Sequence, residues 1–379
     1  MSKLKTFTYN ERRIIGALRS EGMQNRARLS SLLGVTPPTI TRLVSCLIDK
    51  RLLCEQEDPS QEKRIGYPSK LLQLEPSGLY TAGAFFDPDH IYTCVCDLAG
   101  TPLASEIIEI SDRSFDGIMT MTGESVRKHI AASGIDDSRI AGVGVSYPGH
   151  FTTDPNRVFR IKQFADWPSV NIETDLAPYF DYPVSHMSYA KAASLAEFYY
   201  GASRTDRSSC LIWLSYGIGG AAIIDQRLYL GQNKDAAEFG GIFPKSAPRP
   251  SGQNLMDTLR EADEKLTRLD DIDDSWLERP AMQNWMIRSC EQLRWLCLII
   301  ARTFDPEAIV IGGILPPAVI DYFVREIGDG ESLGEDFMVT PPLIKRATKD
   351  TEPHLGAAAL PVYDLFSPAT FSGQATKGW

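Results

Sequence analysis

The sequence of 379 residues contains no long hydrophobic run. Its most apolar segment, residues 295–300, is far too short to span a bilayer, and the opening stretch MSKLKTFTYNERR lacks the apolar core of a secretory signal. These absences argue against a membrane-spanning or secreted protein. We expect a cytoplasmic protein with no membrane partner.

Cysteine and histidine are also scarce. The seven cysteines are odd in number and scattered, so they form no disulfide framework, and buried free thiols are expected. Cys94 and Cys96 would lie on the same face of a strand. No group of histidines and cysteines has the spacing of a metal site, so neither a metal nor any other cofactor is predicted.

Charge is distributed unevenly along the chain. Residues 1–70 hold 13 lysine and arginine residues against 7 aspartate and glutamate residues, a net charge of +6, whereas the remainder carries −16. Only the N-terminal segment therefore suits a polyanion such as DNA. The chain length and a hydrophobic content of 43% allow a small head and a body large enough for two lobes.

Residues 26–50 predict two short helices joined by a tight turn. Gly34 supplies the turn, and Thr36 followed by Pro37 is the pattern of an N-cap with proline at the first helical position. The second helix therefore starts at Pro37. The first helix has an apolar stripe made of Leu29, Leu32 and Leu33.

The second helix has two different faces. Its apolar face, expected to be buried, consists of Ile40, Leu43, Val44 and Leu47. The opposite face carries short hydroxyls and one arginine, which suit contacts with base edges and phosphates. We therefore predict a recognition helix that contacts DNA through Thr36, Pro38, Thr39, Thr41, Arg42 and Ser45. The alternative is a generic helical hairpin whose outer face only meets water.

A helix and a hairpin flank this pair of helices. Residues 9–20 predict a preceding helix, and residues 52–74 predict two strands around a polar tip. The tip contains Lys63 and Arg64, two further candidates for DNA contact. Three helices and a hairpin make a winged helix-turn-helix domain, to which we assign residues 1–75.

The remaining residues, 76–379, alternate strands and helices. Strand-like runs occur at residues 80–86, 91–98, 140–146, 211–215, 221–224 and 308–311, and helical stretches at residues 190–200 and 285–303. Glycine turns at the strand ends indicate α/β layers with a cleft at the ends of the strands. No internal repeat of fixed period is visible.

Several body motifs occur in a distinctive order. They are GVGVSYPG at 142–149, DWPSVNIETDLAPYFDYPV at 166–184, AASLAEFYYGAS at 192–203, LSYGIGGAAIIDQRLYLG at 214–231, AAEFGG at 236–241 and IVIGGIL at 309–315. With them the chain resembles the ROK family, which joins sugar kinases to sugar-responsive repressors. The resemblance implies an actin-like, sugar-kinase type of body with two lobes and a cleft. The winged head is similar to that of the family's xylose and N-acetylglucosamine repressors, whereas the kinases lack it.

The chain departs from the family's kinases at the catalytic positions. Their general base is the aspartate of a Glu-Asn-Asp-Ala-Asn run, and here Tyr189 takes that position, although a tyrosine with a pKa of about 10 is a poor base. Their first phosphate loop is replaced by residues 85–89, whose proline and two acids offer few donors and repel phosphate. The second glycine loop survives in part at residues 216–220, although a turn with positive φ angles would explain it equally. No catalytic residue is assigned.

The resemblance also implies a structural zinc, but the zinc ligands are missing. Gly241 stands where a histidine is expected, and the segment SAPRPSGQNLMD replaces the cysteine loop. Met256 stands about where zinc-bearing members place a sugar-contacting glutamate. We therefore expect a protein without zinc.

Although the catalytic and zinc residues are replaced, the resemblance still implies an effector pocket, with altered chemistry. Glu238 matches the family glutamate that hydrogen-bonds sugar hydroxyls, and Gly149 matches the glycine of a turn lining the same cleft. The other candidates for effector binding are His150, Ser188, Tyr189 and Lys191, with His186 beside them. For the histidines and the lysine, a solvated or locally satisfied side chain is the alternative.

These observations predict a sugar-responsive, DNA-binding transcriptional regulator, interpreted as a repressor. It would bind a double-stranded operator as a homodimer or homotetramer and would be released by a small carbohydrate effector. Two alternatives remain open. One is a sugar kinase with an appended DNA-binding head, and the other is a ligand-independent regulator whose cleft is purely structural.

Overall fold

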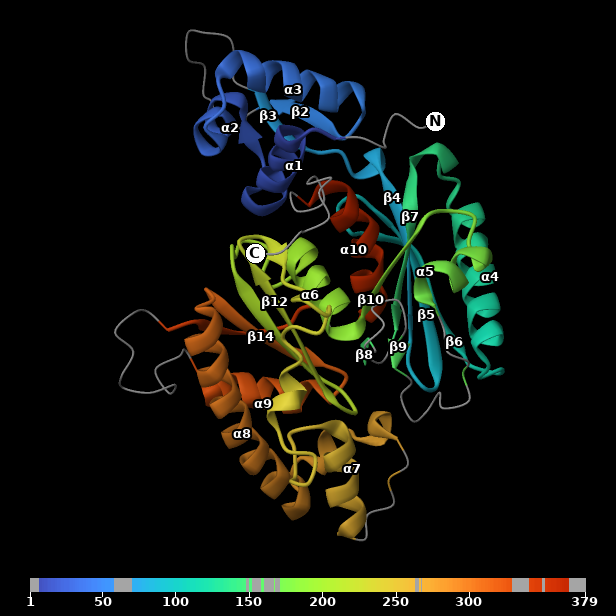
Figure 1. The fold of residues 1–379 in the computed structure, drawn as a ribbon, viewed down its shortest axis with the longest axis vertical. Coiled ribbons are helices and arrows are strands. Elements are labelled where there is room, and N and C mark those ends of the chain that lie inside the picture. The colour runs from blue at the N-terminus through green and yellow to red at the C-terminus, as the bar shows by residue number, and fades with distance from the viewer. Residues whose placement is uncertain are drawn as a thin grey trace. The chain divides into compact units, whose positions relative to one another are not determined.

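The chain forms two compact units (Figure 1). Unit 1 comprises residues 1–149, 156–187 and 354–379, and unit 2 comprises residues 150–155 and 188–353. The computed structural model describes residues 7–57, 70–147, 150–151, 158–159, 167, 171–262, 266, 268–328, 341–349 and 352–367.

The N-terminal part of unit 1 is a head of three helices and a small sheet (Figure 1). Its elements are α1 (Tyr9–Glu21), β1 (Gln24–Asn25), α2 (Arg26–Leu33), α3 (Pro37–Asp49), β2 (Leu53–Glu57) and β3 (Lys70–Leu74). The strand order is β1-β3-β2, with β3 antiparallel to both neighbours. Three helices followed by two antiparallel strands match the element order predicted for the head, and its assignment as a winged helix-turn-helix domain stays a prediction.

The sequence explains where α3 begins and which side it buries. Gly34 ends α2 in the left-handed conformation with a φ of 61°, which a residue without a Cβ adopts at little cost. Pro37 then occupies the first turn of α3, where no N–H is needed. The four predicted core residues are each at most 5% exposed, and they are Ile40, Leu43, Val44 and Leu47.

Two details of the helix pair differ from the prediction. Thr36 takes the N-cap position of α3, but its side chain makes no capping hydrogen bond. Its hydroxyl instead lies 3.0 Å from the Thr39 hydroxyl. In α2 only Leu29 is buried, and Leu32 is 40% exposed.

Unit 1 continues into a five-stranded sheet with the order β10-β7-β4-β5-β6. The strands are β4 (Tyr80–Phe86), β5 (His90–Asp97), β6 (Pro102–Glu109), β7 (Ile140–Tyr147) and β10 (Val184–Ser188). β5 is antiparallel to β4 and β6, whereas β4 and β7 are parallel. Helix α4 (Phe115–Ser133) covers one face of this sheet and α10 (Pro353–Phe366) covers the other (Figure 1).

Helix α10 lies very close to its sheet because two glycines leave room for it. A Cβ added to Gly83 would lie 2.3 Å from the His354 carbonyl oxygen, and one added to Gly144 would lie 1.8 Å from the Ala357 carbonyl oxygen. Pro361, inside α10, lacks the N–H that would donate to that Ala357 carbonyl. The second glycine of the GVGV motif therefore serves the packing of a proline-containing helix on the sheet.

Unit 2 contains a second five-stranded sheet, with the order β13-β12-β11-β14-β15. Its strands are β11 (Ser209–Leu214), β12 (Ile218–Ile224), β13 (Arg227–Leu228), β14 (Ala308–Gly313) and β15 (Leu343–Arg346). Helix α6 (Tyr189–Tyr200) packs on one face. On the other face lie α7 (Gly252–Glu261), α8 (Pro280–Phe304) and α9 (Pro317–Ile327).

Strand β11 shows how alternation builds the two faces of this sheet. Ile212 and Leu214 belong to the large core beneath α8 and α9, whereas Leu211 and Trp213 belong to the smaller core beneath α6. Successive side chains of a strand point to opposite faces, so one strand serves both cores. The sheet is therefore buried on both sides.

The two five-stranded sheets share one topology. In each, the first strand pairs antiparallel with the second, and the second pairs antiparallel with the third. The first strand also pairs in parallel with the fourth strand, and the fifth lies beyond it. This duplicated strand order fits the predicted actin-like body of two lobes.

The remaining described elements are small. Strands β8 (His150–Phe151) and β9 (Val158–Phe159) pair with each other, and α5 spans Ile172–Asp175. Among the described residues, no single helix has both the length and the apolar character needed to cross a membrane. Helices α2 and α3 meet those two criteria only when counted together, and they are bent by 114° relative to each other.

Candidate functional site

The first candidate site is the outer face of α3. Most of the predicted contact residues are exposed, and Thr39 is partly buried; the exposed ones are Thr36, Pro38, Thr41, Arg42 and Ser45. The Thr41 hydroxyl donates to the Pro37 carbonyl oxygen at 3.0 Å, a bond within the helix. Helix α3 therefore presents one arginine and several short hydroxyls on a single open face, on a segment with a positive net charge.

The wing beside α3 is described only at its base. Arg26 and Lys70 both donate to the Glu55 carboxylate, at 2.5 and 2.8 Å, and thereby fasten α2 to the two wing strands. These hydrogen bonds hold the pKa of Glu55 below its usual value. Lys63 and Arg64, which we predicted to contact DNA, lie outside the described residues.

The second candidate site lies at the start of α6 in unit 2. Lys191 is 1% exposed, and its Nζ donates to Glu238 Oε1 at 2.5 Å. A buried ammonium group requires such a partner, because leaving it unpaired in the protein interior is very costly. Of the alternative stated for Lys191, a solvated or locally satisfied side chain, the structure shows the locally satisfied form, and its role in effector binding stays a prediction. The interaction of Glu238 with sugar hydroxyls stays a prediction, with one carboxylate oxygen already bonded to Lys191.

Of the other predicted effector residues, the structure describes some and not others. Ser188 is 6% exposed, and its hydroxyl has no hydrogen-bond partner among the described residues. His186 lies with its Nδ1 3.4 Å from the Tyr147 hydroxyl, so it is locally partnered. Gly149 and the side chain of His150 fall outside what the structure describes. Tyr189 opens α6, directly after Ser188.

The turn between β4 and β5 occupies the position of the first phosphate loop. Asp87 Oδ1 accepts hydrogen bonds from the backbone N–H groups of Asp89 and His90, both at 2.7 Å, and Tyr92 donates to its other oxygen at 3.1 Å. Burial raises the pKa of Asp87, against the opposing effect of these hydrogen bonds. The turn therefore directs two of its amides at its own carboxylate.

The second glycine loop differs from our interpretation of it. Strand β12 begins at Ile218, so Gly219 and Gly220 lie inside a strand, and neither they nor Gly217 has a positive φ angle. The two strand glycines are required by close packing. A Cβ on Gly219 would lie 2.8 Å from the Ala190 Cβ, and one on Gly220 would lie 2.3 Å from the Ala237 carbonyl oxygen.

The region expected to hold zinc in relatives is built without metal ligands. Met256 belongs to the hydrophobic core beneath α8, at 4% exposure. The backbone N–H groups of Gly252 and Gln253 donate to the carbonyl oxygens of Ser215 and Tyr216, at 2.7 and 3.1 Å. Within the described ranges, no group of three or more histidine, cysteine or acidic side chains is placed to hold a metal ion.

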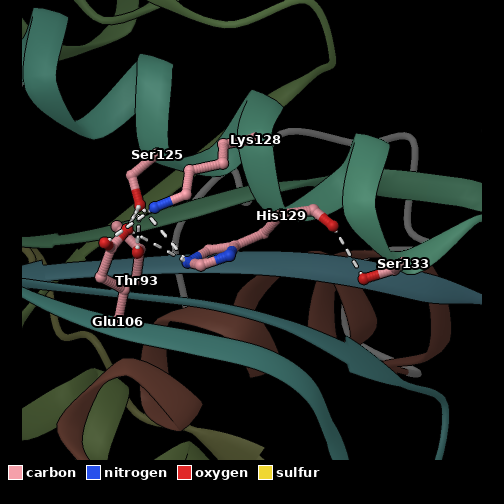
Figure 2. Close-up of polar contacts among 6 residues, drawn as sticks. All are labelled: Thr93, Glu106, Ser125, Lys128, His129 and Ser133. Atoms are coloured by element: carbon pink, nitrogen blue, oxygen red, sulfur yellow. Dashed lines mark hydrogen bonds and ion pairs between the residues drawn. The ribbon is translucent and has the colours of Figure 1, made fainter.

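A third polar cluster lies between α4 and strands β5 and β6 (Figure 2). The Ser125 hydroxyl is 2.7 Å from that of Thr93 and donates to Glu106 Oε2 at 3.1 Å. His129 Nε2 is 3.4 Å from the Ser125 hydroxyl and 3.8 Å from Glu106 Oε2. Serine and carboxylate thus meet the same ring nitrogen, whereas a catalytic triad needs them on opposite nitrogens. Burial lowers the pKa of His129, and the cluster fastens α4 to the sheet.

The head is joined to α10 within unit 1. The rings of Phe7 and Phe366 lie 4.9 Å apart, and Arg12 donates to the Ser367 carbonyl oxygen at 2.8 Å. Beside them, Lys50 donates to Glu11 Oε1 at 2.8 Å. Although burial opposes it, the hydrogen bonds from Lys50 and Thr8 hold the pKa of Glu11 below its usual value. The end of α10 therefore contacts the first helix of the head directly.

At its other end, α10 follows a segment anchored in unit 2. Glu197, 2% exposed on α6, accepts hydrogen bonds from the backbone N–H groups of Thr348 and Lys349 at 2.9 and 2.6 Å. The same carboxylate accepts from the Ala202 N–H at 2.6 Å. Sequence reasoning quoted the motif that contains Glu197 but gave this residue no role. A buried glutamate on an alanine-rich helix was the available signal.

Comparison with known proteins agrees with the fold and the motifs. The ROK family profile matches residues 88–362. The uncharacterized protein y4fQ of Sinorhizobium fredii is 29% identical over 384 residues, covering 100% of this chain and 96% of that protein. The xylose repressor of Bacillus subtilis is 21% identical over 352 residues, covering 88% of this chain and 90% of that repressor.

A solved structure extends the likeness to the head. A ROK family transcriptional regulator described as a homologue of the Escherichia coli Mlc protein superimposes with a TM-score of 0.69 at 19% identity. The superposition covers 96% of this chain and 97% of the regulator. The fold predicted from the sequence, an actin-like body behind an N-terminal head, is thereby confirmed. Because the family profile matches far more than half of the chain, the protein belongs to the ROK family.

Proposed function

We propose that the protein is a DNA-binding transcriptional repressor that responds to a sugar or a sugar derivative. In this proposal residues 1–75 bind an operator, and residues 76–379 bind the effector and associate with a second copy. The observation that carries it is the outer face of α3, where an exposed arginine and exposed hydroxyls project from a basic winged head. Similarity over most of the chain to the B. subtilis xylose repressor supports the same function.

Helix α3 would lie in the major groove of the operator. Arg42 has the donor fork that pairs with a guanine edge, and the hydroxyls of Thr39, Thr41 and Ser45 suit other base edges or phosphates. Thr36 and Pro38 would approach the sugar-phosphate backbone at the start of the helix. Lys63 and Arg64 would add sequence-independent phosphate contacts from the wing. Two heads on a symmetric dimer would require a palindromic operator.

The proposal assigns no catalytic activity to the body. Phosphoryl transfer depends on positioned donors that neutralise the phosphates and on a base that orients the nucleophile. In the turn between β4 and β5, Asp87 accepts the hydrogen bonds of two backbone amides and adds a negative charge there. Tyr189 stands at the position of the family's catalytic aspartate. We therefore expect neither sugar phosphorylation nor a requirement for zinc or another cofactor.

The effector would bind beside the start of α6. The buried Ser188 hydroxyl, unpartnered among the described residues, could exchange hydrogen bonds with a ligand hydroxyl. Glu238, whose Oε1 accepts from Lys191, is the proposed acceptor for ligand hydroxyls, and Tyr189 offers a ring for stacking on a sugar face. Gly149 and His150 stay candidates for effector binding, and Lys191 acts through Glu238. This group of acceptors and donors fits a polyhydroxylated ligand.

Helix α10 provides the proposed path from the body to the head. Glu197 of unit 2 holds the segment that precedes this helix, and Phe366 and Ser367 at its far end contact the head. A ligand that favours one arrangement of the body would thereby change the positions available to the head. It would weaken operator binding by its differential affinity for the two arrangements.

The test is a selection of operator DNA by the full chain, followed by equilibrium binding. We expect an enriched palindrome with half-sites separated by about 10 base pairs or a multiple of that. Arg42→Ala should weaken binding by about five- to hundredfold and relax the preference at one base position. The matched control, Arg207→Ala, removes an exposed arginine of unit 2 and should leave binding unchanged. Absence of any enriched sequence, or equal binding by Arg42→Ala, would contradict the proposal.

A further inference from the structure

Helix α6 of unit 2 begins at a serine that does not cap it. Ser188 takes the N-cap position with extended backbone angles, yet its side chain makes no capping hydrogen bond. The serine N-caps of α4 and α7, Ser114 and Ser251, accept from first-turn N–H groups at 3.0 and 3.4 Å. The first N–H groups of a helix have no acceptor within the helix. The first-turn amides of α6 therefore receive no acceptor from Ser188.

Two buried side-chain donors lie at this end of α6. Ser188 is 6% exposed, and its hydroxyl has no hydrogen-bond partner among the described residues. Trp213 packs with Ala190 in the small core beneath α6, and its buried Nε1 has no partner in the described part of the chain either. Burying a donor without an acceptor is costly. The hydroxyl at the N-cap is thus a group that a bound acceptor would satisfy.

Lys191 adds a positive charge to the first turn of the same helix. A cation is unfavourable there, because the N-terminal end of a helix already carries a partial charge of roughly +0.5. An ammonium group has three N–H donors. Within the described ranges, the buried Lys191 ammonium group donates to one acceptor, Glu238 Oε1, at 2.5 Å. Two of its donors therefore remain for a further acceptor.

The sum of the charges at this end of α6 favours a single negative charge. Lys191 and Glu238 cancel each other, and the helix end contributes roughly +0.5. A carboxylate supplies one negative charge and several acceptor sites, and helix N-termini are ready-made sites for such anions. A phosphate would bring nearly two negative charges close to the Glu238 carboxylate, which would repel it more strongly.

We infer that the N-terminal end of α6 binds the carboxylate of a sugar acid, through the Ser188 hydroxyl, the Lys191 ammonium group and the first-turn amides. Glu238 then accepts from a hydroxyl of the same ligand. The inference deepens the proposed function, since it rests on an effector bound beside α6. It names that effector as an aldonic or uronic acid, and not as a neutral sugar.

Calorimetric titration of the full chain without DNA tests the ligand class. D-gluconate, D-glucuronate, D-galacturonate and D-xylonate are compared with their neutral counterparts D-glucitol, D-glucose, D-galactose and D-xylose, and D-glucose 6-phosphate is added as a phosphorylated probe. At least one acid should bind about tenfold or more tightly than its neutral counterpart, because only the acid forms charge-assisted hydrogen bonds. Neutral counterparts that bind equally well or better, binding of the phosphate alone, or no binding by any acid would overturn the inference.

Two sets of variants test the residues of the site. Ser188→Ala should lower the preference for the acid over its neutral counterpart by about tenfold and leave the melting temperature unchanged, since the hydroxyl has no partner to lose in the described structure. Ser289→Ala is the matched control, because Ser289 is a fully buried serine of α8 whose hydroxyl also lacks a partner among the described residues. It should leave the preference unchanged. An unchanged preference in Ser188→Ala would contradict the assignment.

The lysine needs a double variant, because Lys191→Met alone leaves the Glu238 charge unpaired and can unfold the protein. Lys191→Met combined with Glu238→Gln removes both charges and should fold, as circular dichroism would show, without a preference for the acid. A folded double variant that keeps the preference would overturn the role of Lys191.

The site and the proposed function fail separately in these experiments. An acid that binds with the expected preference but does not release operator DNA would support the carboxylate site and contradict its role as an effector site. Release of the operator by a neutral sugar, with no acid bound, would support the proposed function and overturn the carboxylate site.

Discussion

The two sheets of the body share a strand order, but the turns at the end of their first hairpins are built differently. In unit 1 the turn between β4 and β5 is closed by a side chain, since Asp87 accepts the N–H groups of Asp89 and His90. In unit 2 the turn between β11 and β12 leads into a glycine strand, with Gly219 and Gly220 under close packing. The same strand order is therefore compatible with two differently built turns.

The difference shows which part of an enzyme-like fold can change without loss of the fold. A hairpin turn needs its backbone groups satisfied, and a carboxylate satisfies them as well as a bound phosphate would. A glycine under such close packing has no such substitute, because an added Cβ would collide with neighbouring atoms. In this chain the unit 1 turn satisfies two of its amides with the Asp87 carboxylate, and the glycines of the unit 2 strand lie under close packing.

Breaking the Lys191–Glu238 ion pair is expected to have the largest effect on the stability of unit 2 around strand β12. Gly219 faces Ala190 of α6, and Gly220 faces the two neighbours of Glu238, Ala237 and Phe239, so the ion pair joins the segments that pack on these two glycines of β12. Lys191→Met should lower the free energy of unfolding by about 3 kcal/mol, because it leaves Glu238 without its partner. Denaturant unfolding measures the change.

Two further variants complete that comparison. Combining Lys191→Met with Glu238→Gln should recover much of the loss, since no unpaired charge remains. Arg207→Met removes one partner of an ion pair that is 70% and 64% exposed, and it should change stability by less than about 0.5 kcal/mol. Equal stability of Lys191→Met and the wild type would show that the pair does not hold α6 in place.

The glycine strand gives a second, smaller effect. Gly220→Ala should destabilise the protein by about 1 to 3 kcal/mol, because its Cβ would lie 2.3 Å from the Ala237 carbonyl oxygen. Gly217→Ala is the matched control, since nothing lies within 4 Å of its added Cβ and its φ is not positive. Thermal unfolding compares the two. An equal loss from both would mean that these glycines are required by backbone conformation and not by packing.

Asp87 gives the smallest effect, which depends on pH. Burial raises its folded pKa above the usual value near 3.8, so the folded state is favoured when Asp87 is protonated. Its contribution to stability is present below pH 3.8 and is lost as the pH rises through the raised pKa. Asp87→Asn keeps an acceptor for the amides of the turn but cannot ionise. The free energy of unfolding of this variant, relative to that of the wild type, should therefore rise with pH, by about 1 kcal/mol or less.

The difference in the free energy of unfolding between Asp87→Asn and the wild type is measured at several pH values between pH 3 and pH 6. His90 and Tyr92 also face Asp87, and the variant leaves both unchanged. Parallel curves for the wild type and Asp87→Asn would show that Asp87 is not titrating in this range.

The head could be predicted from the sequence far better than the body. Helical periodicity sufficed for the buried side of α3, because local spacing alone decides which residues of a short amphipathic helix face inward. Periodicity could not predict whether the Thr36 hydroxyl makes a capping hydrogen bond to α3, since the Thr39 hydroxyl is a competing partner. Leu32, a member of the predicted apolar stripe, is 40% exposed, because the burial of a residue depends on what packs against it.

The body shows what local patterns leave out. Lys191 and Glu238 are 47 residues apart, and nothing in their spacing indicates that they meet. Strand order depends on such distant pairings, so the duplicated topology is invisible in the sequence. Helix α10 was missed because Pro361 normally interrupts a helix, whereas here the close approach to Gly144 accommodates it. The second glycine loop was misinterpreted because a glycine's packing neighbours cannot be known beforehand.

The most direct measurement of the central claim is a titration of the operator-bound full chain with individual sugars in the presence of ATP and Mg²⁺. Fluorescence anisotropy of the labelled operator reports release, and ADP is measured in the same sample. The account predicts that at least one sugar releases the operator with no sugar-dependent ADP, and that Arg42→Ala weakens operator binding before any sugar is added. Sugar-dependent ADP formation, or an operator that no sugar releases, would contradict it.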